Sequence, residues 1–319
     1  MSIKIIILDA HTTNPGDLSW QRLSSLGQLQ INPRTEKEDI IPAAHGANVI
    51  ITNKCQITKE IIQALPELKC ICLLATGYNN IDIVSAASND IVVCNAAGYS
   101  TASVAQHIFS MILSVTNGIA EHSNSVHNGD WASSKFSSYT LHELQELKDM
   151  TLGIYGFGQI GKAVAKIAHA FGMKIIATRR SPEKHKTDYV TLVSEEELLD
   201  QSDFLSLNAP LTEDTMYFIN KNSISKMKST AFLINTGRGQ LVNEDELADA
   251  LSRKLIRGAA IDVLSQEPPS ATNPFFGLTN CVLTPHVAWA TKASRARLIE
   301  IVTDNVENFL RGQPQNVVS

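Results

Sequence analysis

Residues 151–180 contain the pattern that most restricts what this chain can fold into. The stretch opens with a short apolar run typical of a buried strand and continues with a G-x-G-x-x-G pattern formed by Gly156, Gly158 and Gly161. Apolar residues at helical spacing follow at 163–171. At a strand-to-helix turn, the first glycine permits the tight turn, the second lets the backbone approach a pyrophosphate, and the third lets the helix pack on the strand. A second strand-like run at 174–178 favours a dinucleotide site over an ordinary glycine-rich turn.

The end of that second run indicates which dinucleotide is bound. An acid that binds the ribose 2′-hydroxyl is expected about 20 residues after the glycines, but this chain has Arg179, Arg180 and Ser181 there. Guanidinium groups and a hydroxyl suit a 2′-phosphate through charge-assisted hydrogen bonds, whereas an acid repels it. NADP(H) is therefore the favoured cofactor. NAD(H) stays open, because both arginines could be solvated beside Lys184 and Lys186.

Outside this stretch, short apolar runs alternate with segments of helical spacing. One alternation precedes the middle of the chain and a second begins at residue 151, which predicts an α/β protein with two doubly wound parallel sheets. Residues 295–310 form an amphipathic segment that would pack on one of the two domains. The polar excursion 121–148 carries three aromatic residues that would dock on a second subunit or on the same chain: Trp131, Phe136 and Tyr139.

Composition limits the classes of partner and compartment. Of the 319 residues, 44% are hydrophobic and 18% charged, as in soluble globular proteins, and a net charge of -5 gives no reason to expect nucleic acid or an anionic membrane as partner. The apolar N-terminal run ends at Asp9, too early for a signal peptide or membrane span. Five cysteines in apolar surroundings predict buried free thiols in a cytoplasmic protein. The spacing of Cys70 and Cys72 is too short for a metal knuckle, so no metal site is expected.

Three turns that follow strands of the second alternation carry reactive groups. Arg238 lies between glycines, Glu267 precedes two prolines, and His286 follows a short apolar run. An arginine can hold a carboxylate by two hydrogen bonds, and an imidazole beside an acid is a proton donor with an orienting partner. Each group alone could be an ordinary surface side chain. Together they supply what the reduction of a 2-keto acid requires.

Seven motifs in order make the chain resemble the D-isomer-specific 2-hydroxyacid dehydrogenases, and in particular the glycerate dehydrogenases, also called hydroxypyruvate reductases. The motifs are ATGYNNID (75–82), CNAAGYSTASVAQH (94–107), LGIYGFGQIG (152–161), LNAPLTEDT (207–215), FLINTGRG (232–239), DVLSQEPP (262–269) and TPHVAWA (284–290). The resemblance implies a Rossmann dinucleotide-binding domain, 99–286, inserted in a flavodoxin-like substrate-binding domain, 1–98 plus 287–319. It also implies a cleft that closes over both ligands and a homodimer built on the dinucleotide-binding domain.

The resemblance further implies roles for single residues. Arg238 would bind the substrate carboxylate and polarise the keto oxygen, while His286 would be the general acid in reduction with Glu267 as its partner. The backbone N–H groups of Thr76 and Gly77 would hold the other carboxylate oxygen. Hydride would pass between NAD(P)H and a small 2-keto acid, giving the D-2-hydroxy acid. Besides the glycines and the 179–181 group, the implied cofactor-binding residues are Thr101, Gln159, Ile160, Asn208, Pro210, Thr236 and Asp262, the last accepting the nicotinamide carboxamide.

The sequence is compatible with other functions. Glu267 argues against formate dehydrogenase, whose pattern has Gln at that position. A D-lactate-type dehydrogenase that acts on another 2-keto acid stays open, as does a dinucleotide-sensing binding protein similar to the corepressors related to this family. Hydroxypyruvate and glyoxylate differ by one hydroxymethyl group, so the preference between them depends on pocket side chains that sequence does not position.

Overall fold

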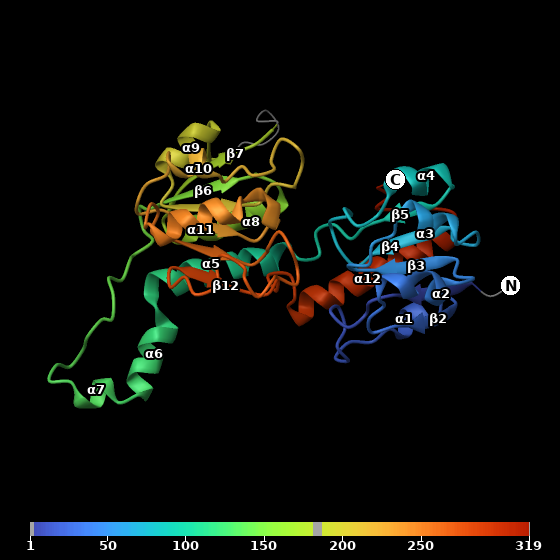
Figure 1. Ribbon diagram of the computed structural model, residues 1–319, viewed down its shortest axis with the longest axis horizontal. Helices are drawn as coiled ribbons and strands as arrows, with labels where there is room; N and C mark the ends of the chain where they lie inside the picture. The colour runs from blue at the N-terminus through green and yellow to red at the C-terminus, as the bar shows by residue number, and fades with distance from the viewer. Residues whose placement is uncertain (1–2, 181–186, 319) are drawn as a thin grey trace. The chain divides into compact units, whose positions relative to one another are not determined.

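The computed structural model describes residues 3–180 and 187–318 and divides into two compact units (Figure 1). The first unit comprises Met1–Ser100 and Ala290–Ser319, and the second unit comprises Thr101–Trp289. The borders expected from the sequence, after residues 98 and 286, differ from these by two and three residues. The second unit is thus an insertion in the chain of the first.

The second unit is built on a seven-stranded parallel sheet with the strand order β12-β11-β10-β9-β6-β7-β8. Its strands are β6 (Thr151–Tyr155), β7 (Lys174–Thr178), β8 (Thr191–Leu192), β9 (Phe204–Leu207), β10 (Phe232–Asn235), β11 (Gly258–Ile261) and β12 (Cys281–Leu283). From β6 the chain adds strands first on one side and then on the other, so the order reverses between β6 and β9. Ligands of such sheets bind beyond the carboxyl ends of the strands, at this reversal.

Helices cover both faces of that sheet (Figure 1). The helices of the second unit are α5 (Thr101–Asn117), α6 (Ile119–His127), α7 (Asp130–Ser133), α8 (Gln159–Ala170), α9 (Glu195–Gln201), α10 (Lys221–Ile224) and α11 (Glu244–Ser252), with a 3-10 turn, η3, at Gly239–Leu241. Buried residues of α5 and α8 form one apolar core with the sheet, and those of α9, α10 and α11 form another. Because both faces are covered, strands such as β9 and β10 are buried along their whole length.

The first unit contains a five-stranded parallel sheet with the order β2-β1-β3-β4-β5. Its strands are β1 (Lys4–Ile7), β2 (Gln28–Ile31), β3 (Val49–Thr52), β4 (Cys70–Leu73) and β5 (Val92–Cys94). Its helices are α1 (Gln21–Ser24), α2 (Ile40–Ala44), α3 (Lys59–Gln63), α4 (Ile83–Ser88) and α12 (Lys292–Leu310), with a 3-10 turn, η1, at Lys37–Asp39. This strand order is that of flavodoxin-like folds. The predicted fold class is confirmed for both units.

The amphipathic segment near the C-terminus packs on the first unit as α12. Arg295, on the first turn of α12, donates two hydrogen bonds of 2.7 and 2.8 Å to the carboxylate of Asp17. This contact raises the pKa of Arg295 and lowers that of Asp17, because each charge is stabilised by the other. After α12, Val317 forms an antiparallel bridge with Cys94, so the end of the chain lies along the outer edge of β5.

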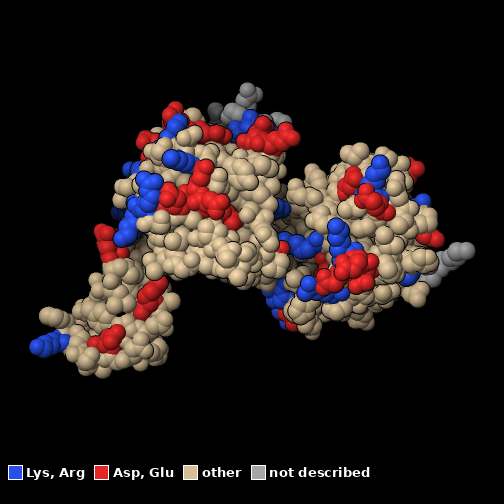
Figure 2. All heavy atoms as spheres, in the orientation of Figure 1, with Lys and Arg blue, Asp and Glu red and all other residues tan. Residues whose placement is uncertain are grey.

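Residues 118–148 leave the sheet of the second unit as an arm that contains α6 and α7 (Figure 1). Trp131 is 51% exposed and Phe136 is 76% exposed, so a large part of each predicted anchor faces solvent, although Nε1 of Trp131 donates to the carbonyl oxygen of Ser137 at 3.1 Å. Figure 2 shows few charged side chains on this arm, whereas acidic and basic groups are interspersed over the visible faces of both units. In the part of the chain that is described, no helix is long and apolar enough to cross a membrane.

Candidate functional site

The loops that follow β11 and β12 bring an acid and an imidazole together. Nδ1 of His286 lies 2.7 Å from Oε2 of Glu267, and the other oxygen of this carboxylate accepts a hydrogen bond of 3.1 Å from the backbone N–H of Leu264. Both side chains are about one quarter exposed, so solvent or a ligand can reach them. A carboxylate at Nδ1 fixes the tautomer that donates from this nitrogen, which leaves Nε2 as the ring atom for a substrate.

Asp262, at the end of β11, holds the backbone of the histidine loop. Its buried carboxylate accepts hydrogen bonds from the hydroxyl of Thr284 (2.6 Å) and from the backbone N–H groups of Val287 and Ala288 (both 2.9 Å). His286 itself has a φ of +54°, a left-handed conformation that costs a non-glycine residue about 1–3 kcal/mol. The three bonds to Asp262 and the bond from the His286 N–H to the Asp262 carbonyl (2.8 Å) stabilise this conformation. The assignment of Asp262 to the nicotinamide carboxamide stays a prediction.

Two residues behind this loop were not identified as site residues from the sequence. Nε2 of His107, on α5, lies 3.1 Å from Oγ1 of Thr284 and 3.6 Å from Oδ1 of Asp262. His107 therefore connects the helix that opens the second unit to the loop that carries His286. The motifs contain both residues, but only the folded arrangement of α5 against β12 brings them into contact.

Arg238 follows β10, the strand next to β11, and its loop packs on the loop of Glu267. A Cβ atom at Gly239 would lie 2.0 Å from the carbonyl carbon of Leu264, so only glycine permits this approach. Nε2 of Gln240 also donates to the carbonyl oxygen of Ser265 at 3.0 Å. The partly buried guanidinium group of Arg238 donates to the carbonyl oxygen of Gly237 at 2.8 Å. The structure thus brings the loops of Arg238, Glu267 and His286 to one edge of the sheet.

The glycine turn between β6 and α8 has the geometry expected of a phosphate-binding loop. Gly156 has a φ of +96°, and a Cβ there would lie 2.5 Å from the backbone nitrogen of Ala209. A Cβ on Gly161 would lie 2.6 Å from the carbonyl oxygen of Gly156, whereas Gly158 has open space around it. Gly158 is the N-cap of α8 and gives no side-chain cap, so the first N–H groups of the helix are available to an anion. Exposed Gln159 and partly buried Ile160 form the start of this helix.

Two of the predicted cofactor residues have buried polar atoms without a hydrogen-bond partner among the described residues. They are Oδ1 of Asn208, after β9, and Oγ1 of Thr236, after β10. Leaving a buried polar group unsatisfied costs about 1–3 kcal/mol, so such atoms in a native structure point to a missing partner. The two residues follow β9 and β10, and the strand order reverses between β9 and its other neighbour, β6. These groups, together with the open space at Gly158, fit a bound dinucleotide.

The remaining predicted cofactor residues have no structural feature that indicates a bound cofactor. Arg179, at the end of β7, donates to the carbonyl oxygen of Phe157 at 3.4 Å, and Arg180 is exposed. Ser181 lies outside the described residues. Pro210 accepts a hydrogen bond of 2.7 Å from the Thr215 hydroxyl, and Thr101 is the first residue of α5.

Tyr155, the last residue of β6, marks the boundary of the glycine turn. Its ring stacks on Phe218 with a centroid separation of 3.6 Å. Burial raises the pKa of Tyr155 to about 12, and the charge of Glu195 acts in the same direction while that of Arg180 opposes it. The phenol therefore stays protonated near neutral pH, and it is a hydrogen-bonding and packing group rather than an acid or base.

Thr76 and Gly77 belong to the first unit, in the loop that follows β4. The hydroxyl of Thr76 donates to the carbonyl oxygen of Ala96 at 2.9 Å, and the Thr76 carbonyl accepts from the Asn95 side chain at 2.7 Å. These bonds join the loop after β4 to the loop after β5 and fix the backbone at Thr76. The assignment of Thr76 and Gly77 to the substrate carboxylate stays a prediction.

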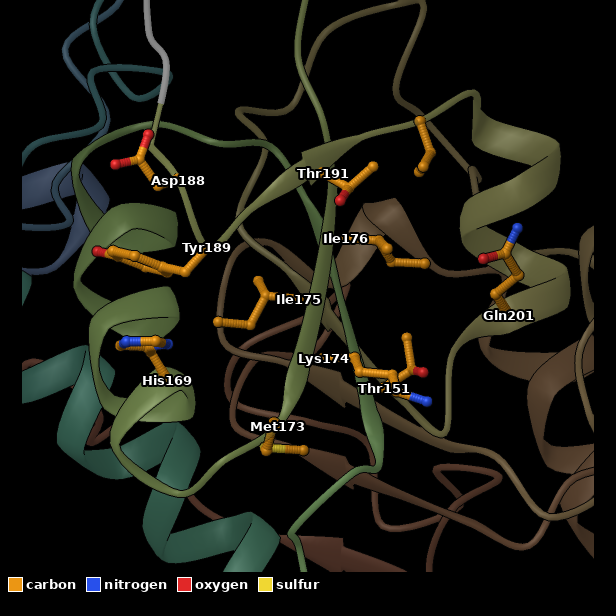
Figure 3. A pocket seen from close by; sticks show the side chains of 11 residues that line it. Thr151, His169, Met173, Lys174, Ile175, Ile176, Asp188, Tyr189, Thr191 and Gln201 are labelled. Carbon is orange, nitrogen blue, oxygen red and sulfur yellow. The ribbon is translucent and has the colours of Figure 1, made fainter.

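A depression of about 470 Å³ on the second unit lies away from this chemistry (Figure 3). Its lining includes Thr151 and Lys174, which begin β6 and β7, and the stacked rings of His169 and Tyr189, 4.4 Å apart. It is therefore at the amino ends of the strands, opposite the glycine turn. We assign no part of the candidate site to it.

Comparison with known proteins identifies the family of the chain. Residues 109–288 match the family of the D-isomer specific 2-hydroxyacid dehydrogenase NAD binding domain. A hydroxypyruvate reductase from Blautia hydrogenotrophica is 39% identical over 324 residues, covering 99% of this chain and 100% of the relative. A glycerate dehydrogenase from Methylorubrum extorquens is 39% identical over 283 residues, or 88% of each chain.

Solved structures with this arrangement cover nearly the whole chain. An acyclic imino acid reductase in complex with NADPH and D-arginine has a TM-score of 0.87 and 32% identity, covering 99% of this chain and 100% of its own. An NADPH-dependent glyoxylate/hydroxypyruvate reductase from Sinorhizobium meliloti, in complex with NADP and malonate, has a TM-score of 0.87 and 25% identity over 100% and 97% of the two chains. The residues that match the family model include the paired acid and imidazole and the glycine turn. The chain therefore belongs to the D-isomer-specific 2-hydroxyacid dehydrogenases and is an oxidoreductase that reduces a 2-keto acid by hydride transfer.

Proposed function

We propose that this enzyme reduces hydroxypyruvate and glyoxylate to the corresponding 2-hydroxy acids and prefers NADPH as the hydride donor. The observation that carries the proposal is the contact of 2.7 Å between His286 Nδ1 and Glu267, beside the loop of Arg238. Relatives named hydroxypyruvate reductase, glycerate dehydrogenase and glyoxylate reductase support the substrate class. A small keto acid with a carboxylate suits one arginine and one proton donor at the same sheet edge.

The proposed mechanism assigns a step to each residue. Arg238 holds the substrate carboxylate and draws electron density from the keto oxygen, which makes the keto carbon more electrophilic. A dinucleotide held by the glycine turn, Asn208 and Thr236 would supply the hydride. His286 donates the proton from Nε2 to the keto oxygen as the alkoxide charge develops. Glu267 accepts the Nδ1 hydrogen bond throughout and so holds the imidazole in the orientation that presents Nε2 to the keto oxygen.

The cofactor preference rests on the end of β7. An acidic residue at this position would accept the 2′-hydroxyl of NAD(H), and Arg179 and Arg180 stand there instead. Among the described residues neither arginine forms an ion pair, and Arg179 makes only a long hydrogen bond to the carbonyl oxygen of Phe157. Both guanidinium groups are therefore able to bind a 2′-phosphate. The two NADP-containing neighbours named above support this assignment.

We further propose a homodimer formed through the arm at 118–148. Large apolar side chains on the arm are exposed, namely Ile119, Val126, Trp131, Phe136, Leu141 and Leu144. Exposed apolar groups gathered on one projecting segment are typical of a protein–protein interface. The five cysteines are free, which supports the predicted cytoplasmic location.

Initial rates test the substrate and cofactor together. Hydroxypyruvate, glyoxylate, pyruvate and phenylpyruvate are each assayed with NADPH and with NADH, using the wild-type enzyme, Arg179→Asp and the control Arg253→Asp. Arg253 is an exposed arginine on the turn after α11, so the control makes the same charge change away from the site. We expect Arg179→Asp to lower kcat/KM for NADPH by about 10- to 100-fold, the loss of one charge-assisted hydrogen bond, while the control keeps the wild-type preference.

Each other outcome would select a different function. A wild-type preference for NADH would contradict the assigned role of Arg179. A preference for pyruvate or phenylpyruvate would indicate a D-lactate-type dehydrogenase. Cofactor binding without turnover of any of these acids would indicate a dinucleotide-sensing binding protein.

A further inference from the structure

Two polar side chains of α5 contact the loop of His286 and have no role in the mechanism proposed above. Oγ of Ser103 donates a hydrogen bond of 2.6 Å to the carbonyl oxygen of Ala288. One helical turn later, Nε2 of His107 lies 3.1 Å from Oγ1 of Thr284. Residues four apart lie on the same face of a helix, so one face of α5 makes both contacts. Because Thr284 precedes and Ala288 follows His286, the helix contacts the loop on both sides of the imidazole.

Thr284 connects the second of these contacts to Asp262. The Thr284 hydroxyl donates to Oδ1 of Asp262 at 2.6 Å, and a hydroxyl has only one proton to give. Nε2 of His107 must therefore carry the proton that lies between it and Thr284, which makes His107 the donor. The same Oδ1 accepts the backbone N–H of Val287 at 2.9 Å. His107 thus orients the hydroxyl that, in turn, orients the carboxylate to which the loop is bonded.

The loop needs contacts of this kind because of its backbone conformation. His286 has a φ of +54°, and a non-glycine residue keeps a left-handed conformation only where several surrounding contacts enforce it. Ser103, Ala288 and Asp262 are buried, so water does not replace a hydrogen bond that is lost among them. Removal of either α5 donor should therefore let the loop relax and move the imidazole.

We propose that Ser103 and His107 are positioning residues of the reduction, which keep residues 284–288 in the conformation that presents His286 to the keto oxygen. The inference rests on the proposed function, in which His286 is the general acid. A displacement of about 1 Å at a reacting group can lower a rate by about 100-fold. Loss of either donor should therefore lower turnover although neither side chain is assigned to substrate or cofactor.

Single variants measure the effect on turnover. They are Ser103→Ala, His107→Leu and His107→Gln, which keeps an N–H donor. Ser110→Ala is the control, because the Ser110 hydroxyl donates to the Gln106 carbonyl within α5 at 3.0 Å. We expect kcat to fall by about 10-fold in Ser103→Ala and His107→Leu, by less in His107→Gln, and not in the control. The KM for hydroxypyruvate should stay near the wild-type value, since its carboxylate is assigned to Arg238.

The same substitutions in a His286→Ala background separate positioning from a general effect on the fold. A residue that acts through the imidazole has nothing left to position when the imidazole is absent, so adding Ser103→Ala or His107→Leu should not lower the residual kcat further. A residue that only stabilises the fold should lower kcat by the same factor in both backgrounds. Circular dichroism checks folding, and Ser103→Ala, which removes a single hydroxyl, decides the matter if His107→Leu does not fold.

The outcomes distinguish this inference from the proposed function. Wild-type kcat in folded Ser103→Ala and His107→Leu proteins would overturn the inference, as would an equal loss in the His286→Ala background. If either result came with a His286→Ala enzyme that had lost its turnover, only the inference would fail. A His286→Ala enzyme that kept its turnover would overturn the proposed general acid and the inference with it.

Discussion

The two halves of the candidate site in the second unit differ in how complete they are. In the proton-transfer half, formed by the loops after β11 and β12, the side chains of Asp262, Glu267 and His286 already contact their partners at 2.6–2.9 Å. In the dinucleotide half, formed by the glycine turn and the ends of β9 and β10, Asn208 and Thr236 each have a buried polar atom that finds no partner among residues 3–180 and 187–318. The protein itself orients the proposed proton donor, whereas a bound cofactor would complete the other half.

This difference has a physical reason. A general acid must be held in one tautomer and one orientation before the reaction, so its hydrogen bonds are made within the chain. Groups that recognise a cofactor must stay available until it binds, and their unsatisfied hydrogen bonds reduce the stability of the protein without ligand. Substitutions in the first half should therefore affect turnover, and those in the second half should affect cofactor affinity. Five substitutions, in four experiments, test this division.

The largest expected effect is the loss of turnover in His286→Ala. Without the general acid, kcat should fall by about 10²- to 10⁴-fold, while the dissociation constant of NADPH stays unchanged because the imidazole belongs to the proton-transfer half. Steady-state kinetics and a fluorescence titration with NADPH measure the two quantities. His169→Ala is the control, since His169 stacks on Tyr189 at the opposite end of the sheet. A variant that kept most of its turnover would remove His286 from the mechanism.

A smaller effect on turnover is expected for Asp262→Asn. The amide nitrogen cannot accept a hydrogen bond, so at least one of the bonds to Thr284, Val287 and Ala288 is lost and the others lose their charge assistance. We expect the free energy of unfolding to fall by about 1.5–3 kcal/mol, and kcat to fall less than in His286→Ala because the imidazole remains. Urea denaturation and kinetics measure both. Unchanged kcat would show that Asp262 does not position His286.

Two glycines of the same turn provide a matched pair in the dinucleotide half. The Cβ of Gly161→Ala would lie 2.6 Å from the carbonyl oxygen of Gly156, so the free energy of unfolding should fall by about 1–3 kcal/mol. Gly158→Ala meets no atom within 4 Å and has a φ of -87°, so stability should stay constant or rise by up to about 1 kcal/mol. NADPH affinity should nevertheless fall, because the new methyl group occupies the space of the pyrophosphate. If Gly158→Ala bound NADPH normally, the pyrophosphate would have to lie elsewhere.

The sequence predicted much of this site because parallel strands share one edge. Once Gly156, Arg238, Glu267 and His286 are each placed after a strand of one sheet, their loops must lie at the same end of it. The pattern of glycines likewise predicted which one would form the tight turn and which would pack against the strand. Both are local consequences of chain order and side-chain size.

Other features depend on contacts between distant segments and could not be predicted. The bonds from Asp262 to Thr284, Val287 and Ala288 join residues more than twenty positions apart. Cys94 lies beside Cys72 only because of the register between β4 and β5. The lack of a partner for Asn208 Oδ1 and Thr236 Oγ1 is likewise visible only when the hydrogen bonds of all the described neighbouring groups are known. Sequence patterns give the ends of strands but not these registers.

The smallest expected effect separates stability from affinity most sharply. Thr236→Val removes a buried hydroxyl oxygen that has no partner in the described structure and keeps the shape of the side chain. The free energy of unfolding of the ligand-free enzyme should stay constant or rise by up to about 1 kcal/mol, whereas NADPH affinity should fall because the cofactor loses a hydrogen bond. Thr116→Val is the matched control, since its buried hydroxyl donates to the Ile112 carbonyl at 3.0 Å. The control should lose about 0.5–1.5 kcal/mol of stability and no affinity. If Thr236→Val were destabilised like Thr116→Val and bound NADPH normally, its hydroxyl would have a structural partner, and the two halves would not differ in the way described.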